Sequence, residues 1–282
     1  MGDTMMQFIR HFLLAVQFFT RIPITGRLAE WVGFSPAMLR ASAAHFPAVG
    51  MLVGAVAAGV YGLLAALLPD TTFAPLVAAV LSTIATALLT GGFHEDGLAD
   101  VADGLGGSYD KARALEIMKD SRVGAFGAMA LVLALLAKVA LLALLGGVDG
   151  IPDGWDEKPF TAWYVCSALF AGHVVSRTLA LLLVAWLPYV GDAAASKSKP
   201  LADQISPGSL LIAFIWCFIA LAAVLCAQAA IDLIVACSLA LVALLVMHRL
   251  FKRRLQGFTG DCLGAAQQVC EIAFYLGLAI SL

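Results

Sequence analysis

The stretch APLVAAVLSTIATALLTGGFHEDGLADVADG covers residues 74–104 and joins an apolar run directly to the densest group of acids in the chain. The chain is 62% hydrophobic and only 13% charged, yet four acids fall here within nine residues: Glu95, Asp96, Asp100 and Asp103. In a helix, at about 100° per residue, the three aspartates lie within roughly a 60° wedge, because residues three and four apart share a face. We therefore expect three carboxylates on one helix face, at the end of an apolar segment.

Three carboxylates on one stripe repel each other unless a cation lies among them. Mg²⁺ takes oxygen ligands, typically one or two carboxylates together with waters and substrate phosphates. The stretch therefore suggests a metal site for phosphoryl chemistry, and a solvated acidic loop is the alternative. No Lys or Arg interrupts the acids, and the small residues Gly97, Ala99 and Gly104 leave room for a ligand near the backbone. Both features favour the metal site.

The composition predicts an all-α fold, a polytopic integral membrane helical bundle that forms a single domain over residues 1–282. Several apolar runs approach the ~20 residues that a helix needs to cross a bilayer. Residues 1–44 are predicted to be an amphipathic interfacial segment, because Phe8, Phe12, Val16 and Phe19 recur at helical spacing beside arginines. We expect about seven transmembrane helices, near 46–68, 73–93, 124–147, 160–187, 209–228, 231–250 and 263–282.

Basic residues fall on alternate connections between these spans. The connections 94–123, 188–208 and 251–262 carry Lys and Arg, whereas the others hold only Lys158. Lys and Arg prefer cytoplasmic loops, so the amino terminus and the active-site segment 94–123 are expected to face the cytoplasm, in a bacterial inner membrane. The acids within 148–159 then form a solvated external turn. A formal net charge of −2 gives no reason to expect a nucleic-acid partner.

Four charged residues lie within or just inside predicted spans: Lys138, Arg177, Asp232 and Glu271. Each costs about 2.5–3.5 kcal/mol there unless it faces the protein interior or water. Lys138 and Arg177 are candidates for binding phosphate groups, and a structural pairing with Glu271 is the alternative for both. Asp232 is interpreted as a residue that starts a helix. His173, one turn before Arg177, is expected to be a hydrogen-bonded interior histidine.

Two further segments share the predicted cytoplasmic side. The stretch 119–127 places Lys119, Arg122 and two glycines just before a span, where a helix N-terminus suits phosphate oxygens. Asp261 stands at the mouth of the last span, either as a substrate-binding acid or as an ordinary N-cap. His94 directly precedes the carboxylates and is a candidate base, or a hydrogen-bond donor to a metal ligand.

These residues carry a resemblance. The sequence resembles the cobalamin synthase family, the adenosylcobinamide-GDP ribazoletransferases, along almost its entire length. In this membrane setting the His-x-Asp-Gly-Leu-Ala-Asp-x-x-Asp-Gly core is highly specific. The motifs are Phe19-Thr20-Arg21-Ile22-Pro23, Phe46-Pro47 with Gly50 and Gly54, the stretch 92–104, Met118-Lys119-Asp120-Ser121-Arg122 with Gly124, Ser176-Arg177, and Thr259-Gly260-Asp261 with Leu263-Gly264-Ala265.

The resemblance implies a Mg²⁺-dependent inner-membrane phosphotransferase that completes cobalamin. In that reaction the 5′-hydroxyl of α-ribazole, or its 5′-phosphate, attacks the cobinamide-linked phosphate of adenosylcobinamide-GDP, and GMP leaves. The partners are then these small molecules and the lipid bilayer, with a homo-oligomer left open. Such chemistry asks a protein mainly to neutralise charge on the diphosphate.

The resemblance and the residue types together assign roles. We assign the metal to Asp96, Asp100 and Asp103, with Glu95 a weaker ligand because the family pattern is variable at that position. His94 or a metal-free carboxylate of the same stripe would deprotonate the attacking hydroxyl. Substrate and phosphate groups are assigned to Lys119, Arg122, Lys138, Arg177 and Asp261.

Two other functions remain as alternatives. The stretch Asp96-Gly97-Leu98-Ala99 is also similar to the Asp-Gly-x-x-Ala core of the CDP-alcohol phosphotransferases, but those normally have Arg after the Ala, where this chain has Asp100. A cation transporter with intramembrane carboxylates is the non-enzymatic alternative. It is disfavoured because the acids stand at the end of a run and not at a mid-membrane break.

Overall fold

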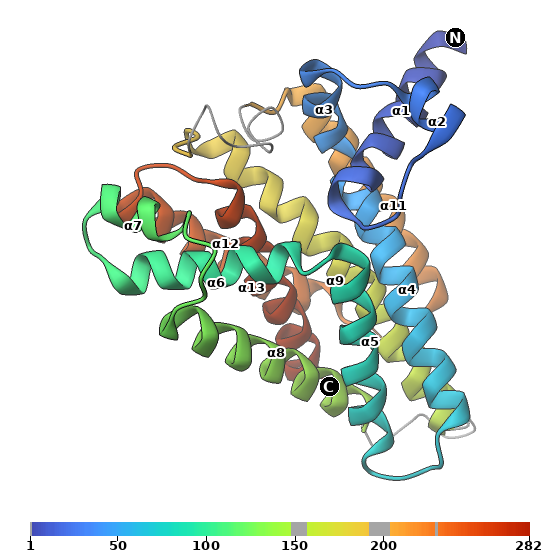
Figure 1. The fold of residues 1–282 in the computed structure, drawn as a ribbon. Helices are drawn as coiled ribbons and strands as arrows, with labels where there is room; N and C mark the ends of the chain where they lie inside the picture. Colours follow the sequence, from blue (N-terminus) through green and yellow to red (C-terminus); the bar gives the residue numbers. More distant parts are fainter. Residues whose placement is uncertain (1, 148–156, 192–203, 229–230) are drawn as a thin grey trace.

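The computed structural model describes residues 2–147, 157–191, 204–228 and 231–282, and in these residues the chain is helical apart from turns and one isolated bridge (Figure 1). The helices are α1 Gly2–Phe19, α2 Gly26–Val32, α3 Pro36–Ser42, the short 3₁₀ turn η1 Ala43–His45, α4 Phe46–Leu67, α5 Ala74–Thr90, α6 Phe93–Gly107, α7 Lys111–Ile117, α8 Ala125–Gly146, α9 Glu157–Trp186, α11 Pro207–Ala227, α12 Leu233–Arg254 and α13 Gly260–Ile280. The predicted all-α bundle is confirmed.

The seven predicted spans correspond to α4, α5, α8, α9, α11, α12 and α13, with ends that agree to within a few residues. Among the described residues, six helices are long and apolar enough to cross a membrane on their own. The seventh, α5, has 17 residues and qualifies only together with α6. Because α6 turns away by 90°, we treat it as part of the connection 94–123 and not as a span.

A sharp bend between α5 and α6 sets the direction of the acidic helix. Gly91 ends α5 with φ +71° and Gly92 begins α6 with φ +69°. Two consecutive left-handed residues are accessible to glycine and costly for other residues. The backbone N–H of Arg21 donates to the carbonyl of Leu89 (2.7 Å) and holds the end of α1 against this bend. In Figure 1, α5 runs along the bundle and α6 runs across it.

The long helix α9 lies at the centre of the bundle. Its most apolar stretch is 78% buried, whereas the corresponding stretches of α8 and α11 are only 17% buried. Helix α4 packs along α9, and α13 packs between α9, α12 and α6. The outer helices therefore present leucine, valine and phenylalanine outward, as expected of helices surrounded by lipid.

The amino-terminal segment is amphipathic, as predicted. Helix α1 buries Leu14, Ala15 and Phe19 against the bundle and exposes the polar side chains of Gln7 and Gln17. The Ser35 hydroxyl caps α3 by accepting from the N–H of Met38, and Pro36 follows at the first helical position, a usual combination at a helix start.

The basic connections meet at one end of the molecule. Val190 N–H donates to the Phe258 carbonyl (2.9 Å), which joins the connections 188–208 and 251–262. The Arg254 guanidinium donates to the carbonyls of Leu105 (3.0 Å) and Ser108 (2.7 Å), which joins 251–262 to 94–123. The predicted acidic turn around Asp153, and the residues Lys197 and Lys199 of 188–208, lie outside the described residues.

Candidate active site

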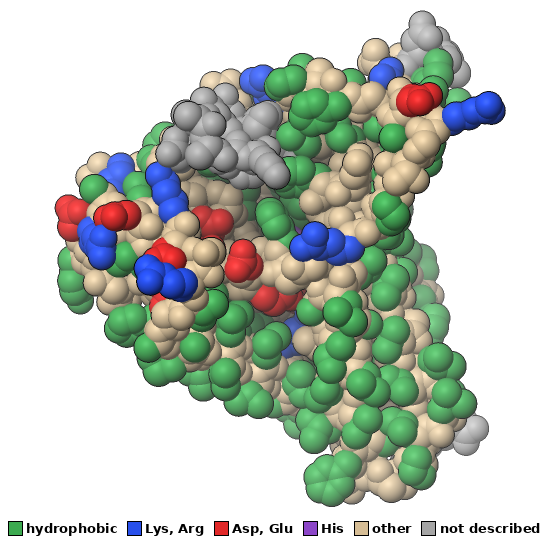
Figure 2. All heavy atoms as spheres, viewed as in Figure 1, with side chains coloured by type: hydrophobic (Ala, Val, Ile, Leu, Met, Phe, Trp, Pro, Cys, Tyr) green, Lys and Arg blue, Asp and Glu red, His purple; other side chains and the backbone are tan. Residues whose placement is uncertain are grey.

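Helix α6 carries the acidic stripe as the spacing predicted. Asp96 is exposed, Asp100 is half-buried, and Asp103 is buried at 8% exposure. Figure 2 shows that acidic side chains gather in a hollow across the middle of this face, with Lys and Arg side chains nearby. The lower part of the same face is predominantly hydrophobic, so the hollow lies at the end of the apolar surface.

A close crossing of α6 and α13 adds Asp261 to this stripe. A Cβ at Gly97 would lie 2.8 Å from the Asp261 carbonyl oxygen, and one at Gly264 would lie 3.1 Å from the His94 carbonyl oxygen. The two backbones therefore touch where both residues are glycine. Asp261 is not the N-cap: the hydroxyl of Thr259 caps α13 by accepting from the N–H of Cys262, and it donates to the Asp261 carboxylate (3.2 Å). The N-cap alternative is therefore wrong, and Asp261 takes its place beside the acids of α6.

The electrostatics of the stripe reflect this crowding. The pKa of Asp100 is raised to about 7, first by burial and then by the charges of Asp261, Asp96 and Asp103. Like charges in one site disfavour ionisation, and a bound cation relieves the repulsion. The three acids Asp96, Asp100 and Asp261, hereafter the acidic cluster, therefore form a group whose mutual repulsion a bound cation would relieve.

Asp103 has a different role from its neighbours. Its two carboxylate oxygens accept from the backbone N–H groups of Gly124 (2.6 Å) and Gly127 (2.8 Å), at the start of α8. Asp103 thereby satisfies donors that a helix N-terminus otherwise leaves without a partner. The predicted metal-binding and catalytic roles of Asp103 therefore compete with a structural one, in which it ties α6 to α8.

Glu95 faces away from the acidic cluster. Its Oε1 accepts from the Gln268 side chain (3.1 Å), while its Oε2 is buried without a hydrogen-bond partner. Within the described residues, no three His, Cys, Asp or Glu side chains are arranged closely enough to ligate one ion together. The described residues therefore do not support a metal site in which Glu95 and the aspartates are ligands together.

His94 also lies on the inner face of α6. It is 2% exposed, stacks on Phe46 (ring centroids 5.7 Å, interplanar angle 13°) and has an unpartnered Nε2. Burial and the charge of Arg177 lower its pKa well below the usual range, so the ring is neutral. Since residues two apart on a helix lie on roughly opposite faces, His94 does not point along the stripe of Asp96. The geometry therefore does not bring this predicted base to the acidic cluster.

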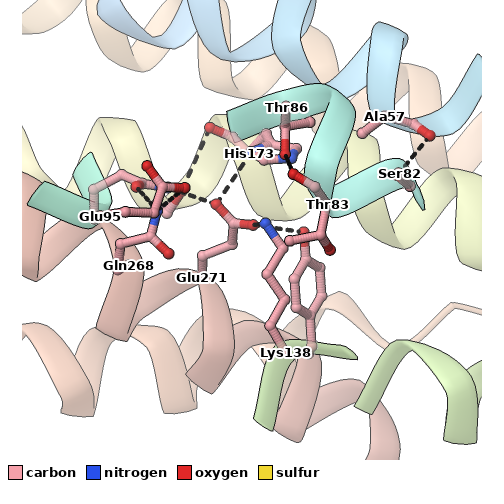
Figure 3. A network of polar contacts seen from close by, with 12 residues as sticks. Ala57, Ser82, Thr83, Thr86, Glu95, Lys138, His173, Gln268 and Glu271 are labelled. Atoms are coloured by element: carbon pink, nitrogen blue, oxygen red, sulfur yellow. Dashed lines mark hydrogen bonds and ion pairs between the residues drawn. The ribbon is translucent and has the colours of Figure 1, made fainter. Parts of the chain in front are cut away.

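Lys138 belongs to a polar network inside the bundle (Figure 3), and Arg177 joins this network through His173. The Lys138 ammonium lies 2.6 Å from the Glu271 carboxylate, and both side chains are at most 3% exposed. Arg177 donates to the carbonyl of His173 (3.0 Å) and contacts its ring nitrogen Nδ1 (3.1 Å), which in turn lies 3.1 Å from Glu271. The structure thus shows the structural pairing with Glu271 for Lys138, and this pairing competes with its predicted phosphate-binding role. The hydrogen-bonded interior position of His173 is confirmed.

The other predicted cations are at the surface. Lys119 and Arg122 are exposed in the turn between α7 and α8, where the Arg122 guanidinium pairs with Asp120 (2.5 Å). Asp232 caps α12 by accepting from the N–H groups of Ile234 and Val235, which confirms its interpretation as a helix start.

Two features were not predicted. Arg21 is exposed and its side chain lies against Gly91, at the bend between α5 and α6. The Gln267 and Gln268 side chains link Glu271 to Glu95. Arg21 stands in the Phe-Thr-Arg-Ile-Pro motif and the two glutamines follow Asp261 a few residues later, but nothing in those segments indicates which helix these three residues contact.

Comparisons with known proteins agree on one family. The family model described as Cobalamin-5-phosphate synthase matches residues 11–279. The chain is 71% identical to the adenosylcobinamide-GDP ribazoletransferase of Polaromonas naphthalenivorans (strain CJ2), covering 99% of this chain and 100% of that protein. The proteins of the same name from Albidiferax ferrireducens and Leptothrix cholodnii are 62% and 45% identical, covering 99% and 95% of this chain and 100% and 94% of theirs. No solved structure matches the chain.

Proposed function

The chain belongs to the cobalamin-5-phosphate synthase family, and we propose that it joins adenosylcobinamide-GDP to α-ribazole, or to its 5′-phosphate, with release of GMP. Relatives named adenosylcobinamide-GDP ribazoletransferase match it over nearly their whole lengths. The match covers α1 to α13, so the enzyme is a transferase of cobalamin biosynthesis embedded in a membrane. Neither the CDP-alcohol phosphotransferase nor the transporter alternative finds support in these relatives.

The acidic cluster is the observation that supports placing the reaction at this end of the bundle. Asp96, Asp100 and Asp261 converge from two helices at the polar end of the bundle, and burial together with the charges of neighbouring aspartates raises the pKa of Asp100 to about 7. Lys119 and Arg122 are exposed in the α7–α8 turn, where Arg122 pairs with Asp120, and Arg21 is exposed at the α5–α6 bend; these three cations are assigned to the substrate's phosphates. Phosphoryl transfer needs this combination, because its catalysis is mostly positioning and charge stabilisation.

The donor set of the acidic cluster fits Mg²⁺. Hard cations take carboxylate oxygens, and Mg²⁺ usually binds one or two of them and completes its shell with waters and substrate phosphates. Asp96, Asp100 and Asp261 would hold it, at most two of them directly and the rest through waters, because among the described residues no three such side chains are close enough to ligate one ion together. When bound, Mg²⁺ would neutralise charge on the diphosphate and on the leaving phosphate.

The phosphoryl transfer forms one P–O bond and breaks another. The 5′-oxygen of α-ribazole forms a bond to the cobinamide-linked phosphorus, the bond from that phosphorus to the bridging oxygen of the diphosphate breaks, and GMP leaves with that oxygen. The hydroxyl proton passes to a carboxylate of the acidic cluster that the metal does not engage. His94 is not assigned this step, because its ring lies on the other face of α6.

We further place the enzyme in the inner membrane with this end in the cytoplasm. The connections rich in Lys and Arg, 94–123 and 251–262, lie together beside the acidic cluster, and the hydrogen bonds of Arg254 join them. Lys and Arg favour cytoplasmic connections, so a single orientation of the protein in the membrane accounts for the position of both basic connections.

A direct assay tests the proposal. Protein purified in detergent is mixed with adenosylcobinamide-GDP, α-ribazole and Mg²⁺, and released nucleotide is separated by chromatography. We expect GMP in step with adenosylcobalamin, and a loss of at least 100-fold in turnover for Asp100→Asn, as is common when a group that stabilises transition-state charge is removed. Asp70→Asn, an exposed aspartate in the loop between α4 and α5, is the matched control and should keep its activity.

Two results would contradict the proposal. Turnover of a cytidylyl-activated substrate with release of CMP would identify the other transferase class. Normal GMP release by both Asp96→Asn and Asp100→Asn at limiting Mg²⁺ would leave the family activity intact and remove the acidic cluster from it.

A further inference from the structure

A second polar site adjoins the acidic cluster. Where the end of α6, α7 and the start of α8 meet, the structure contains a cavity of about 600 Å³, within the range of small-ligand pockets. Its lining combines an aromatic ring, apolar side chains, two arginines and three carboxylates, and the residues that matter here are Asp103, Arg113, Glu116, Asp120, Arg122 and Phe126.

The lining offers a flat apolar surface beside a carboxylate. The Phe126 ring is 48% exposed and lies directly over Gly106. Glu116 pairs with Arg113 at 2.7 Å, but the two side chains are 68% and 61% exposed. An ion pair so exposed contributes little and exchanges readily for another partner. Asp120 is less available, because it also accepts from the backbone N–H of Arg122.

The cavity is correctly spaced from the acidic cluster for a nucleotide. Asp103 lines the cavity and follows Asp96 and Asp100 on the same stripe of α6. At 1.5 Å per residue, Asp96 and Asp103 are about 10 Å apart along the helix axis, roughly the distance from a diphosphate to its base. A substrate whose diphosphate lies at the acidic cluster can therefore extend its nucleoside into the cavity.

We propose that this cavity binds the guanosine moiety of the activated substrate and of the departing GMP; this rests on the function proposed above. The base stacks on Phe126, and the Glu116 carboxylate accepts from the adjacent N1–H and N2–H groups of guanine. Arg122 lies at the mouth of the cavity. It binds the phosphate after its guanidinium has released Asp120. Adenine and the pyrimidines lack that pair of adjacent donors, so the lining selects guanine by hydrogen bonding and by stacking.

The test measures binding of GMP alone, with Mg²⁺, by calorimetry on the full chain in nanodiscs. Phe126→Ala removes the stacking surface and should weaken GMP binding about tenfold or more. Glu116→Gln should reduce the preference for GMP over AMP, while binding of α-ribazole stays unchanged in both variants. The matched controls are Phe34→Ala and Glu30→Gln, which are exposed residues of the amino-terminal segment far from this cavity in sequence and should bind GMP normally.

The outcomes separate this inference from the proposed function. GMP binding that is undetectable, or equally strong in Phe126→Ala and Glu116→Gln as in the controls, would overturn the guanosine site even if the enzyme turns over. GMP binding that both variants weaken, in a protein that never releases GMP from adenosylcobinamide-GDP, would support the site and refute the proposed reaction. Thermal melting of each variant in the same nanodiscs identifies loss of fold, and a variant that melts early is replaced by Phe126→Leu or Glu116→Met.

Discussion

Replacing Lys138 by methionine distinguishes between two roles of its ammonium group, a structural one and a substrate-binding one. Methionine keeps the length of the side chain and removes its charge, and an apolar side chain is acceptable inside a span. The ammonium lies 2.6 Å from the carboxylate of Glu271, whose side chain is 1% exposed. The substitution therefore leaves a buried carboxylate without its closest cation.

The cost can be judged from the remaining partners of Glu271. Removing one member of a buried ion pair typically destabilises a protein by about 3–5 kcal/mol. Glu271 retains hydrogen bonds from Tyr275 (3.1 Å) and Gln267 (2.5 Å) and its contact with His173 (3.1 Å), so we expect the lower end, about 3 kcal/mol. For a chain of this size that corresponds to a fall in Tm of about 6–12 °C.

Unfolding can be followed with a thiol-reactive dye, since Cys166, Cys262 and Cys270 are buried and free in the folded protein. Lys252→Met, at an exposed position of α12, is the control and should change stability by less than about 0.5 kcal/mol. Adding Glu271→Gln to Lys138→Met should restore part of the loss, because the buried carboxylate that lost its closest cation is then removed as well. A Lys138→Met protein that melts like the wild type, and has a raised KM only for the GDP-activated substrate, would refute this reasoning.

Three further predictions follow from the fold and the site. Because a proton competes with the metal at Asp100, whose pKa is about 7, Mg²⁺ affinity measured by calorimetry should rise from pH 6 to pH 8; an affinity independent of pH would contradict this. Alkaline phosphatase fused after Asp153 should be active and fused after Arg254 inactive, and the reverse result would invert the topology. Gly97→Ala should cost about 1–3 kcal/mol by overpacking and reduce activity with it, while Gly59→Ala, with open space around it, should be neutral; equal melting temperatures would show that the helix crossing is looser than described.

The helices were predictable because the information they need is local. Runs of about 20 apolar residues define the spans, and the spacing of the acids indicated that a helix in this stretch, observed from Phe93 to Gly107, would place them on one face. The stripe of Asp96, Asp100 and Asp103 follows from helix geometry alone. The 90° bend before α6 was not predicted, although two adjacent glycines, Gly91 and Gly92, stand at it, because their left-handed conformation is only one of several that glycine adopts.

The partners of the charged residues could not be predicted in the same way. Asp261 and Asp100 are about 160 residues apart in the chain, and only the contact of α6 with α13 brings them together. Asp103 resembles its two neighbours in sequence, yet the start of α8 lies against it and takes both of its oxygens. Which side chain a charge meets depends on how helices cross, and periodicity within one helix carries no information on that.

The division of charges between the two faces of α6 shows how the site is held in place. On the inner face, Glu95 accepts from Gln268, which is linked through Gln267 to Glu271 and so to Lys138 on α8. The outer face is left with Asp96 and Asp100, which have no such anchor and are available to a metal. The high cost of a charge in an apolar run shows that the charge has a partner, but that partner can be another side chain as well as a ligand. Here the buried charges stabilise the helix, and the half-exposed ones beside them are those suited to the chemistry.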